Sequence, residues 1–276
     1  MPIVIRTNIP SMQAQKNLQK SSSALNASFD RLSSGLRIVT AADDAAGLAI
    51  SESMSTQIRS FTIAERNAQD AVSMVQTAEG ALAEVHSIMG RLRELAMQAA
   101  NGSYTSTDRG FLDTEYQALK AEIGRIQQSA KFNGKELLAN DVSTIQFQIG
   151  LNNTASDQLQ LSFGGFGLTA ITASTNLVAG SSISAALTAL STIDAALSIV
   201  STERAKYGAT MNRLGITISS IETMRLNLSA ANSRIRDLDV ATETAALARN
   251  QVLSQAGVTV LAQANQLPQL ALNLLQ

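Results

Sequence analysis

The sequence is most informative in what it lacks. Its 276 residues include no cysteine and a single histidine, His86. The absence of cysteine excludes disulfides, thiolate metal sites and cysteine nucleophiles, and a single histidine excludes any multi-histidine metal site. The formal net charge of −1 gives no electrostatic reason to expect nucleic acid or an anionic membrane as a partner.

Proline is confined to positions 2, 10 and 268. Because proline is the strongest helix breaker, nothing between Ser11 and Leu267 forbids very long helices. Only 4% of the residues are aromatic, although 45% are hydrophobic. This composition is typical of helices that pack through narrow seams, rather than of a thick globular core.

The hydrophobic pattern indicates that such helices form. Apolar residues recur every seven positions over Met54–Ala99, which is the pattern of a coiled-coil seam. We expect one helix over this range, with a lead-in from Asp43 and an end at the turn signal Asn101-Gly102. Helical periodicity returns over Leu112–Ile126 and again, without a break, over Ala186–Leu238.

The middle of the chain has a different pattern. Hydrophobic and polar residues alternate over Ile145–Ile149 and over Leu159–Phe163, with Asn152-Asn153 between them. This alternation predicts a β-hairpin at about 143–163. The predicted fold is therefore mainly α, a long antiparallel α-helical coiled-coil bundle with a small β-hairpin in the middle of the chain.

The two ends of the chain are poor in charge, and no charged residue follows Arg249. An isolated pair of such helices buries little surface, so we expect it to become ordered when many copies surround it. We predict a terminal coiled-coil domain, 1–42 plus 236–276, and a helical rod domain, 43–235. The residues expected to be buried between copies are Leu18, Leu25, Phe29, Leu32, Leu253, Leu261, Leu270 and Leu272.

No set of residues indicates catalysis. Asp43 and Asp44 could be metal ligands, but they stand where a helix is expected to begin, and carboxylates there cap free N–H groups. Asp237 and Asp239 are interpreted as part of a charged collar on a helix, or as salt-bridge partners between subunits. We therefore expect no enzyme, no metal, no cofactor and no small-molecule substrate. No transmembrane span and no cleaved signal peptide are expected either.

Several longer stretches resemble the bacterial flagellins. The resemblance covers about 1–140 and 185–276, in the family's order and at both ends of the chain. It is carried by the stretches IRTNIPSMQAQKNL (5–18), LSSGLRIVTAADDAAGLAIS (32–51), GRLRELAMQAANG (90–102), KFNGKELL (131–138) and a nearly continuous C-terminal run that begins SAANSRIRDLDVATETAALARNQ (229–251).

The resemblance implies a short flagellin without the large outer variable domains of longer members. Such a protein is a self-assembling subunit of the extracellular flagellar filament, used for motility and exported through the flagellar secretion channel. Its expected partners are copies of itself, an export chaperone and the export apparatus, the filament cap and the hook–filament junction proteins. The stretch containing Gly35 and Arg37 is then a spoke that joins the inner helix to the rod, and Asp43 and Asp44 mark the start of the long helix.

The resemblance also implies a face that a host's Toll-like receptor recognises, with Arg91, Leu95 and Glu115 at the matching positions. Two alternatives to a filament subunit stay open from the sequence. One is a hook–filament junction protein, although members of that group usually preserve the C-terminal stretch less completely. The other is a flagellin-like cell-surface binding protein that uses residues 140–180 to bind glycans.

Overall fold

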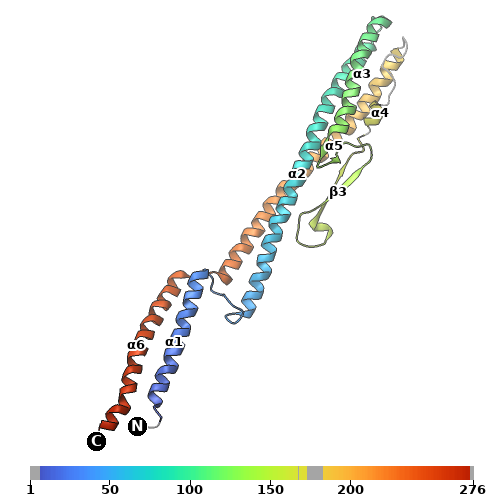
Figure 1. The fold of residues 1–276 in the computed structure, drawn as a ribbon. Coiled ribbons are helices and arrows are strands. Elements are labelled where there is room, and N and C mark those ends of the chain that lie inside the picture. Colours follow the sequence, from blue (N-terminus) through green and yellow to red (C-terminus); the bar gives the residue numbers. More distant parts are fainter. Residues whose placement is uncertain (1–6, 167, 173–182, 274–276) are drawn as a thin grey trace. The chain divides into compact units, whose positions relative to one another are not determined.

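The structure is a computed structural model that describes residues 7–166, 168–172 and 183–273, with side chains omitted at 169, 170 and 267–273. The chain order is α1 (Ile9–Ser34), α2 (Ala45–Ala99), α3 (Ser106–Ser129), β1 (Lys131–Phe132), β2 (Lys135–Glu136), β3 (Ser143–Gln148), the 3₁₀ turn η1 (Ala155–Asp157), β4 (Gln158–Phe163), α4 (Leu168–Thr172), α5 (Ile183–Arg236) and α6 (Val240–Asn273). Figure 1 shows these elements along the chain. The mainly α fold with a small hairpin is confirmed.

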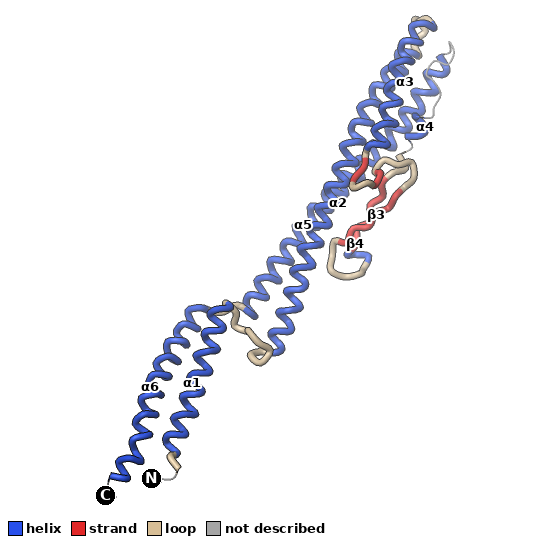
Figure 2. The backbone as a smooth tube through the Cα atoms, in the orientation of Figure 1, coloured by secondary structure: helices blue, strands red, loops and turns tan. Residues whose placement is uncertain are grey.

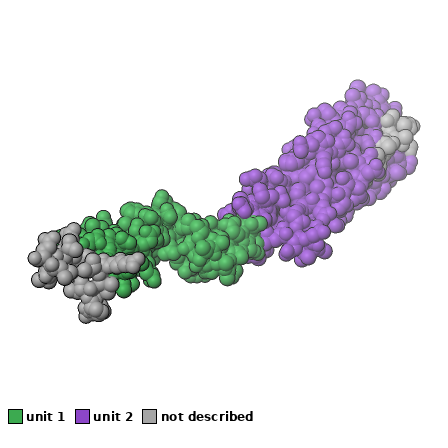
Figure 3. Space-filling model, turned by 60° about the horizontal axis from the view of Figure 1, so that its bottom comes forward, with its two compact units in different colours: residues 1–58, 226–276 green, residues 59–225 purple. Residues whose placement is uncertain are grey.

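The chain divides into two compact units (Figure 3). One unit comprises residues 1–58 and 226–276, and the other comprises residues 59–225. The second unit holds the main hydrophobic core, and the first unit holds both terminal helices.

The core of the 59–225 unit is built along α2. Its heptad residues from Ala68 to Ala99 are almost completely buried against α3, α5 and the hairpin. Helix α5 runs antiparallel to α2 (Figure 1), and three ion pairs follow that register. They join Glu65 to Arg225 at 2.7 Å, Glu79 to Arg204 at 2.7 Å and Arg93 to Asp194 at 2.6 Å.

The turn between α2 and α3 is closed by a buried arginine. The Arg109 guanidinium, on α3, donates from Nε to the Ala99 carbonyl at 3.0 Å and from Nη2 to the Asn101 carbonyl at 3.2 Å. These carbonyls lie at the end of α2 and just beyond it, where no helical N–H can reach them. Thr105 and Asp108 form a reciprocal capping box that starts α3.

The predicted hairpin lies at 143–163, with β3 and β4 antiparallel and Ile145 opposite Leu161. Leu159, Leu161 and Phe163 point into the core, and the intervening Gln160 and Ser162 are exposed. The Asn67 amide on α2 donates to the Gln148 carbonyl at 2.9 Å, which holds the loop end of β3 on the bundle. Figure 2 shows this hairpin beside the helices.

A second, shorter hairpin was not predicted. Helix α3 ends at Ser129, and the Asn133-Gly134 pair connects β1 to β2. Both turn residues have positive φ, 46° at Asn133 and 77° at Gly134. An Asn-Gly turn of this hand matches the natural twist of a two-stranded hairpin.

The expectation of unbroken helix to Leu238 was wrong. Helix α5 ends at Arg236 and α6 begins at Val240. Asp239 causes a new start, because its carboxylate accepts hydrogen bonds from the Ala241 N–H at 3.0 Å and from the Thr242 hydroxyl at 2.7 Å. A carboxylate that satisfies the free N–H groups of a first turn favours a helix start over continuation.

By length and composition alone, α5 could cross a membrane. Its buried residues, among them Ile193, Val200 and Leu214, instead belong to the core of the 59–225 unit. Core helices meet the same length and hydropathy criteria as membrane helices.

Candidate functional site

The terminal helices α1 and α6 lie side by side and antiparallel within the unit that contains both chain ends (Figure 1). Near the start of α1, the Asn8 amide donates to the Ala264 carbonyl at 2.9 Å and the Ser11 hydroxyl donates to the Asn265 side chain at 2.7 Å. A Cβ atom added to Gly257 would lie 3.2 Å from Leu18 Cδ1. The absence of a side chain at Gly257 therefore permits close packing of the two helices.

This helix pair buries very little. The buried residues of α1 are the small Ser11, Ala14 and Ser28, and among the α6 side chains described only Ala264 is buried. Large hydrophobic side chains remain in solvent instead. They are Ile9, Met12 and Phe29 on α1 and Val240, Val252, Leu253, Val258 and Val260 on α6.

The predicted assembly residues belong to this surface to different degrees. Phe29 and Leu253 are 53% and 50% exposed. Half-buried positions are occupied by Leu18, Leu25, Leu32 and Leu261. The side chains of Leu270 and Leu272 lie outside the described residues. The exposed valines of α6 were not singled out from the sequence, although the charge-free run after Arg249 contains most of them.

The predicted spoke is attached to the junction between α5 and α6. Gly35 ends α1 in the left-handed region, with φ of 69°, and its carbonyl accepts from the Leu238 N–H at 3.0 Å. The Arg37 N–H donates to the Arg236 carbonyl at 2.7 Å, and the Arg37 guanidinium donates to the Ile235 carbonyl at 2.6 Å. Arg37 therefore satisfies carbonyls at the end of α5, where no helical N–H remains.

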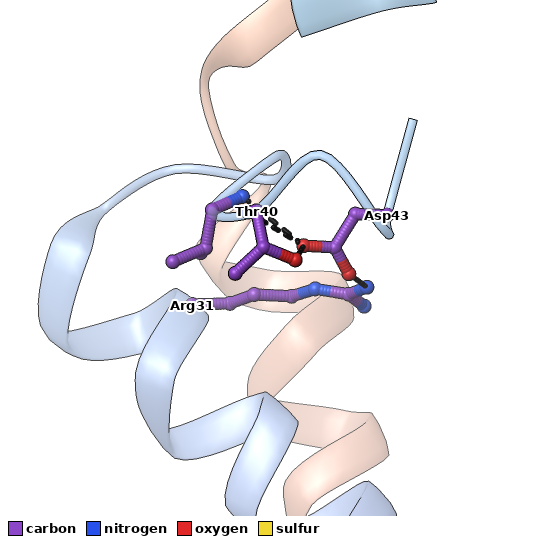
Figure 4. Close-up of polar contacts among 4 residues, drawn as sticks. Arg31, Thr40 and Asp43 are labelled. Carbon is purple, nitrogen blue, oxygen red and sulfur yellow. Dashed lines mark hydrogen bonds and ion pairs between the residues drawn. The ribbon is translucent and has the colours of Figure 1, made fainter. Parts of the chain in front are cut away.

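Asp43 joins the two ends of the spoke through contacts with Arg31 and Thr40 (Figure 4). One carboxylate oxygen accepts from the Thr40 N–H at 2.9 Å and from the Thr40 hydroxyl at 3.1 Å, and the other lies 2.9 Å from Arg31 Nη2. The Thr40 N–H, followed by Arg31, lowers the pKa of Asp43 to about 2. The carboxylate therefore links the end of α1 to the loop that leads into α2.

Asp44 has a different task from its neighbour. It directly precedes α2, and its carboxylate accepts from the Gly47 N–H at 2.8 Å, which is the bonding pattern of an N-cap. Gly47 is buried beneath Asp44, and a Cβ there would collide with the Asp44 carboxylate and lie 2.9 Å from Ile38 Cδ1. Ile38 is 1% exposed, so the loop anchors a hydrophobic side chain next to this cap.

The three residues of the predicted receptor face lie on neighbouring turns of α2 and α3. Arg91 Nε lies 2.8 Å from the Glu115 carboxylate, and a second contact at 2.9 Å reaches Glu94, which was not predicted. The hydrogen bonds that Arg91 donates to Glu115, and then to Glu94, raise the pKa of Arg91. Leu95 is 1% exposed and packs inside the bundle, so Arg91 and Glu115 form the accessible part.

No group of His, Asp or Glu residues suited to hold a metal ion occurs within the described parts of the chain. The acidic pairs that could have been ligands, Asp43 with Asp44 and Asp237 with Asp239, lie at helix boundaries. Three of these four carboxylates accept backbone N–H bonds there.

The flagellin family models match both parts of the chain. The bacterial flagellin N-terminal helical region matches residues 5–143, and the C-terminal helical region matches residues 190–275. Among curated proteins, a flagellin of Halalkalibacterium halodurans is 43% identical over 274 residues, covering 99% of this chain and all of the relative. The flagellar filament 33 kDa core protein of Treponema phagedenis is 39% identical over 290 residues, covering 99% of this chain and all of that protein.

A solved structure agrees with these relatives. The crystal structure of Bacillus cereus flagellin matches with a TM-score of 0.51 and 33% identity, covering 60% of this chain and 94% of that one. The two family models match the two ends of the chain, and the two flagellar relatives are matched over their whole length. This chain belongs to the bacterial flagellins, a family of structural proteins rather than enzymes.

Proposed function

We propose that α1 and α6 form the innermost layer of a filament built from many copies of this chain. As a flagellin, the chain is a structural subunit of the flagellar filament and is exposed outside the cell. Neither a hook–filament junction protein nor a cell-surface binding protein is favoured, because the whole chain matches flagellins.

The supporting observation is the exposed hydrophobic surface of the terminal pair. Burial of apolar surface contributes about 25 cal/mol per Å² to stability. In the single subunit, Phe29 and Leu253 are half or more exposed, so this stabilisation is still available to contacts between subunits. Copies that surround the pair would bury this surface, whereas a single subunit cannot. The proposed assembly domain is 1–42 plus 236–276.

Deletion tests this assignment. A chain lacking 1–42, or one lacking 237–276, should keep the helical core of the 59–225 unit and remain monomeric. Circular dichroism reports the fold, and electron microscopy after seeding or salting out reports polymerisation. Filaments formed by either truncated chain would contradict the proposed role of the termini.

Export in an unfolded state through the flagellar secretion channel, without a cleaved signal peptide, is part of the proposal. It requires an export chaperone and the export apparatus, and the growing filament requires a cap and hook–filament junction proteins. The described structure has no disulfide to delay unfolding, since the chain lacks cysteine.

A host's Toll-like receptor is a further proposed partner, through Arg91 and Glu115. Both side chains are about half exposed, whereas Leu95 acts through packing beneath them. A monomer carrying Arg91→Ala should activate receptor-bearing cells less than the parent monomer. Equal activation by the two proteins would argue against this face.

A further inference from the structure

The turn between α2 and α3 contains Asn101-Gly102, and its geometry favours a reaction between these two residues. The Asn101 side-chain carbonyl accepts from the Ser103 N–H at 3.1 Å. This bond makes an Asx turn, in which the side chain folds over the following peptide. That peptide carries the Gly102 nitrogen, which is the group that can attack Asn101 Cγ.

Two further features of the turn favour attack by that nitrogen. None of the hydrogen bonds in the described chain employs the Gly102 N–H. Glycine also lacks a Cβ that would hinder approach to Cγ. Because the Asn101 side chain is already held over the Asn101–Gly102 peptide, part of the entropic barrier that a flexible chain must overcome is removed.

The Ser103 N–H also points at the oxygen on which charge would develop. When a nitrogen adds to the Asn101 side-chain carbonyl, that oxygen becomes an oxyanion, and a fixed N–H donor stabilises it. The same donor is already in place in the ground state, at 3.1 Å from Oδ1.

We infer that Asn101 is a site of spontaneous deamidation in the folded protein. The Gly102 nitrogen forms a bond to Asn101 Cγ and loses its proton, the bond from Cγ to Nδ2 breaks, and ammonia leaves. Water then opens the resulting succinimide at either carbonyl. Opening at Cγ gives aspartate with the normal main chain, and opening at the main-chain carbonyl gives isoaspartate. No oxidant or reductant is needed.

The reaction would disturb the contacts by which Arg109 closes this turn. The Asn101 main-chain carbonyl accepts from Arg109 Nη2 at 3.2 Å and from the Tyr104 N–H at 3.4 Å. Isoaspartate would displace that carbonyl by inserting a methylene into the main chain. Either product adds a negative charge at the turn.

The chain supplies its own control in Asn133-Gly134, the other Asn-Gly pair. Asn133 is held at φ of 46° in a hairpin turn. No hydrogen bond to its side-chain oxygen is found among the described residues. The two sites therefore share the reactive dipeptide and differ in the oxyanion donor and the Asx turn.

The test is to age the full-length monomer at mildly alkaline pH and follow each site by peptide mass spectrometry. In the folded protein, Asn101 should react at least about tenfold faster than Asn133, a conservative share of what one oxyanion donor contributes in enzymes. In urea the two rates should converge. Equal rates in the folded protein, or a difference that persists in urea, would overturn the inference.

Two variants test the Gly102 nucleophile and the Ser103 N–H donor separately. Gly102→Ala should slow the reaction at Asn101 strongly, because the added methyl group hinders approach of the nitrogen to Cγ. The new Cβ would lie no closer than 3.9 Å to its nearest neighbour, Ile183 Cδ1, so the fold is preserved. Ser103→Pro removes the donor and should slow Asn101 while Asn133 keeps its rate. An unchanged Asn101 rate in either variant would contradict the mechanism.

Discussion

Single residues decide how the spoke is attached. Asp43 and Asp44 are adjacent, yet one carboxylate closes the loop to Arg31 and the other starts α2 by accepting from Gly47. Each carboxylate accepts a hydrogen bond from a backbone N–H, that of Thr40 for Asp43 and that of Gly47 for Asp44. The first N–H groups of a helix need such acceptors because they lack partners within the helix. What the sequence shows as an acidic pair is, at this scale, two separate helix-boundary contacts.

The contact at Gly47 predicts a sensitive position. Gly47→Ala should lower the free energy of unfolding by about 1–3 kcal/mol, because the added methyl group collides with Asp44 and Ile38 in a packed site. Urea denaturation measures the change. The matched control is Gly80→Ala, also on α2, where an added Cβ has nothing within 4 Å and the helix should gain about 0.5–1 kcal/mol. Equal stability of the two variants would refute the collision.

The lowered pKa of Asp43 predicts an acid-side dependence of the spoke. Its folded pKa is about 2 against an ordinary 3.8, so its contribution to stability is complete above 3.8 and is lost as the pH falls toward 2. A carboxyl-resolved NMR titration measures the pKa directly. In Asp43→Asn the dependence of unfolding on pH in this interval should become shallower. A titration midpoint at the ordinary value would show that the Thr40 and Arg31 contacts are absent in solution.

Individual elements show which parts of the fold are readable from the sequence. The β3–β4 hairpin was predicted because Ile145 and Phe147 on one strand and Leu159 and Leu161 on the other repeat with period two. The break at Asp237–Asp239 was missed because Ile235 and Leu238 continue the helical period and no glycine or proline interrupts it. Asp239 followed by Thr242 carries an N-cap signal that was available.

Arg109 was missed for a different reason. A charged side chain that is 7% exposed goes against the usual preference of arginine for solvent. Its partners are main-chain carbonyls at the end of another helix, and these leave no trace in side-chain patterns. Likewise, the seam of α2 predicts which residues are buried, but not that Glu65 and Arg225 will set the register against α5.

Ion pairs between α2 and α5 should differ in strength from pairs within one helix. The Glu65 side chain is 15% exposed in its pair with Arg225, whereas Lys206 in its pair with Glu203 is 63% exposed. A double-mutant cycle should give a coupling of about 0.5–1 kcal/mol for the first pair and about 0.3 kcal/mol for the second. Added salt should weaken the second pair more. A stronger coupling for Lys206–Glu203 would contradict a register role for Glu65.

At the scale of the whole molecule, hydrophobic burial is unequal between the units. The 59–225 unit encloses long runs of fully buried heptad residues, and the terminal helices bury mainly alanine and serine. A stable subunit with an incompletely buried helix pair suits a protein that must exist as a monomer before it polymerises. The contrast was predicted from the charge and periodicity of the sequence, but the exposed fraction of each side chain could be known only from the structure.

The most direct test is polymerisation of a chain with one charge placed on the terminal helices. Leu253→Asp puts a carboxylate at a position that is 50% exposed in the subunit and, in our account, buried between subunits, where an unpaired charge is costly. Leu253→Met is the control, because it conserves volume and hydrophobicity. By electron microscopy the parent chain and Leu253→Met should form hollow helical filaments, and Leu253→Asp should stay monomeric with an unchanged circular dichroism spectrum. Normal filaments from Leu253→Asp would contradict the account.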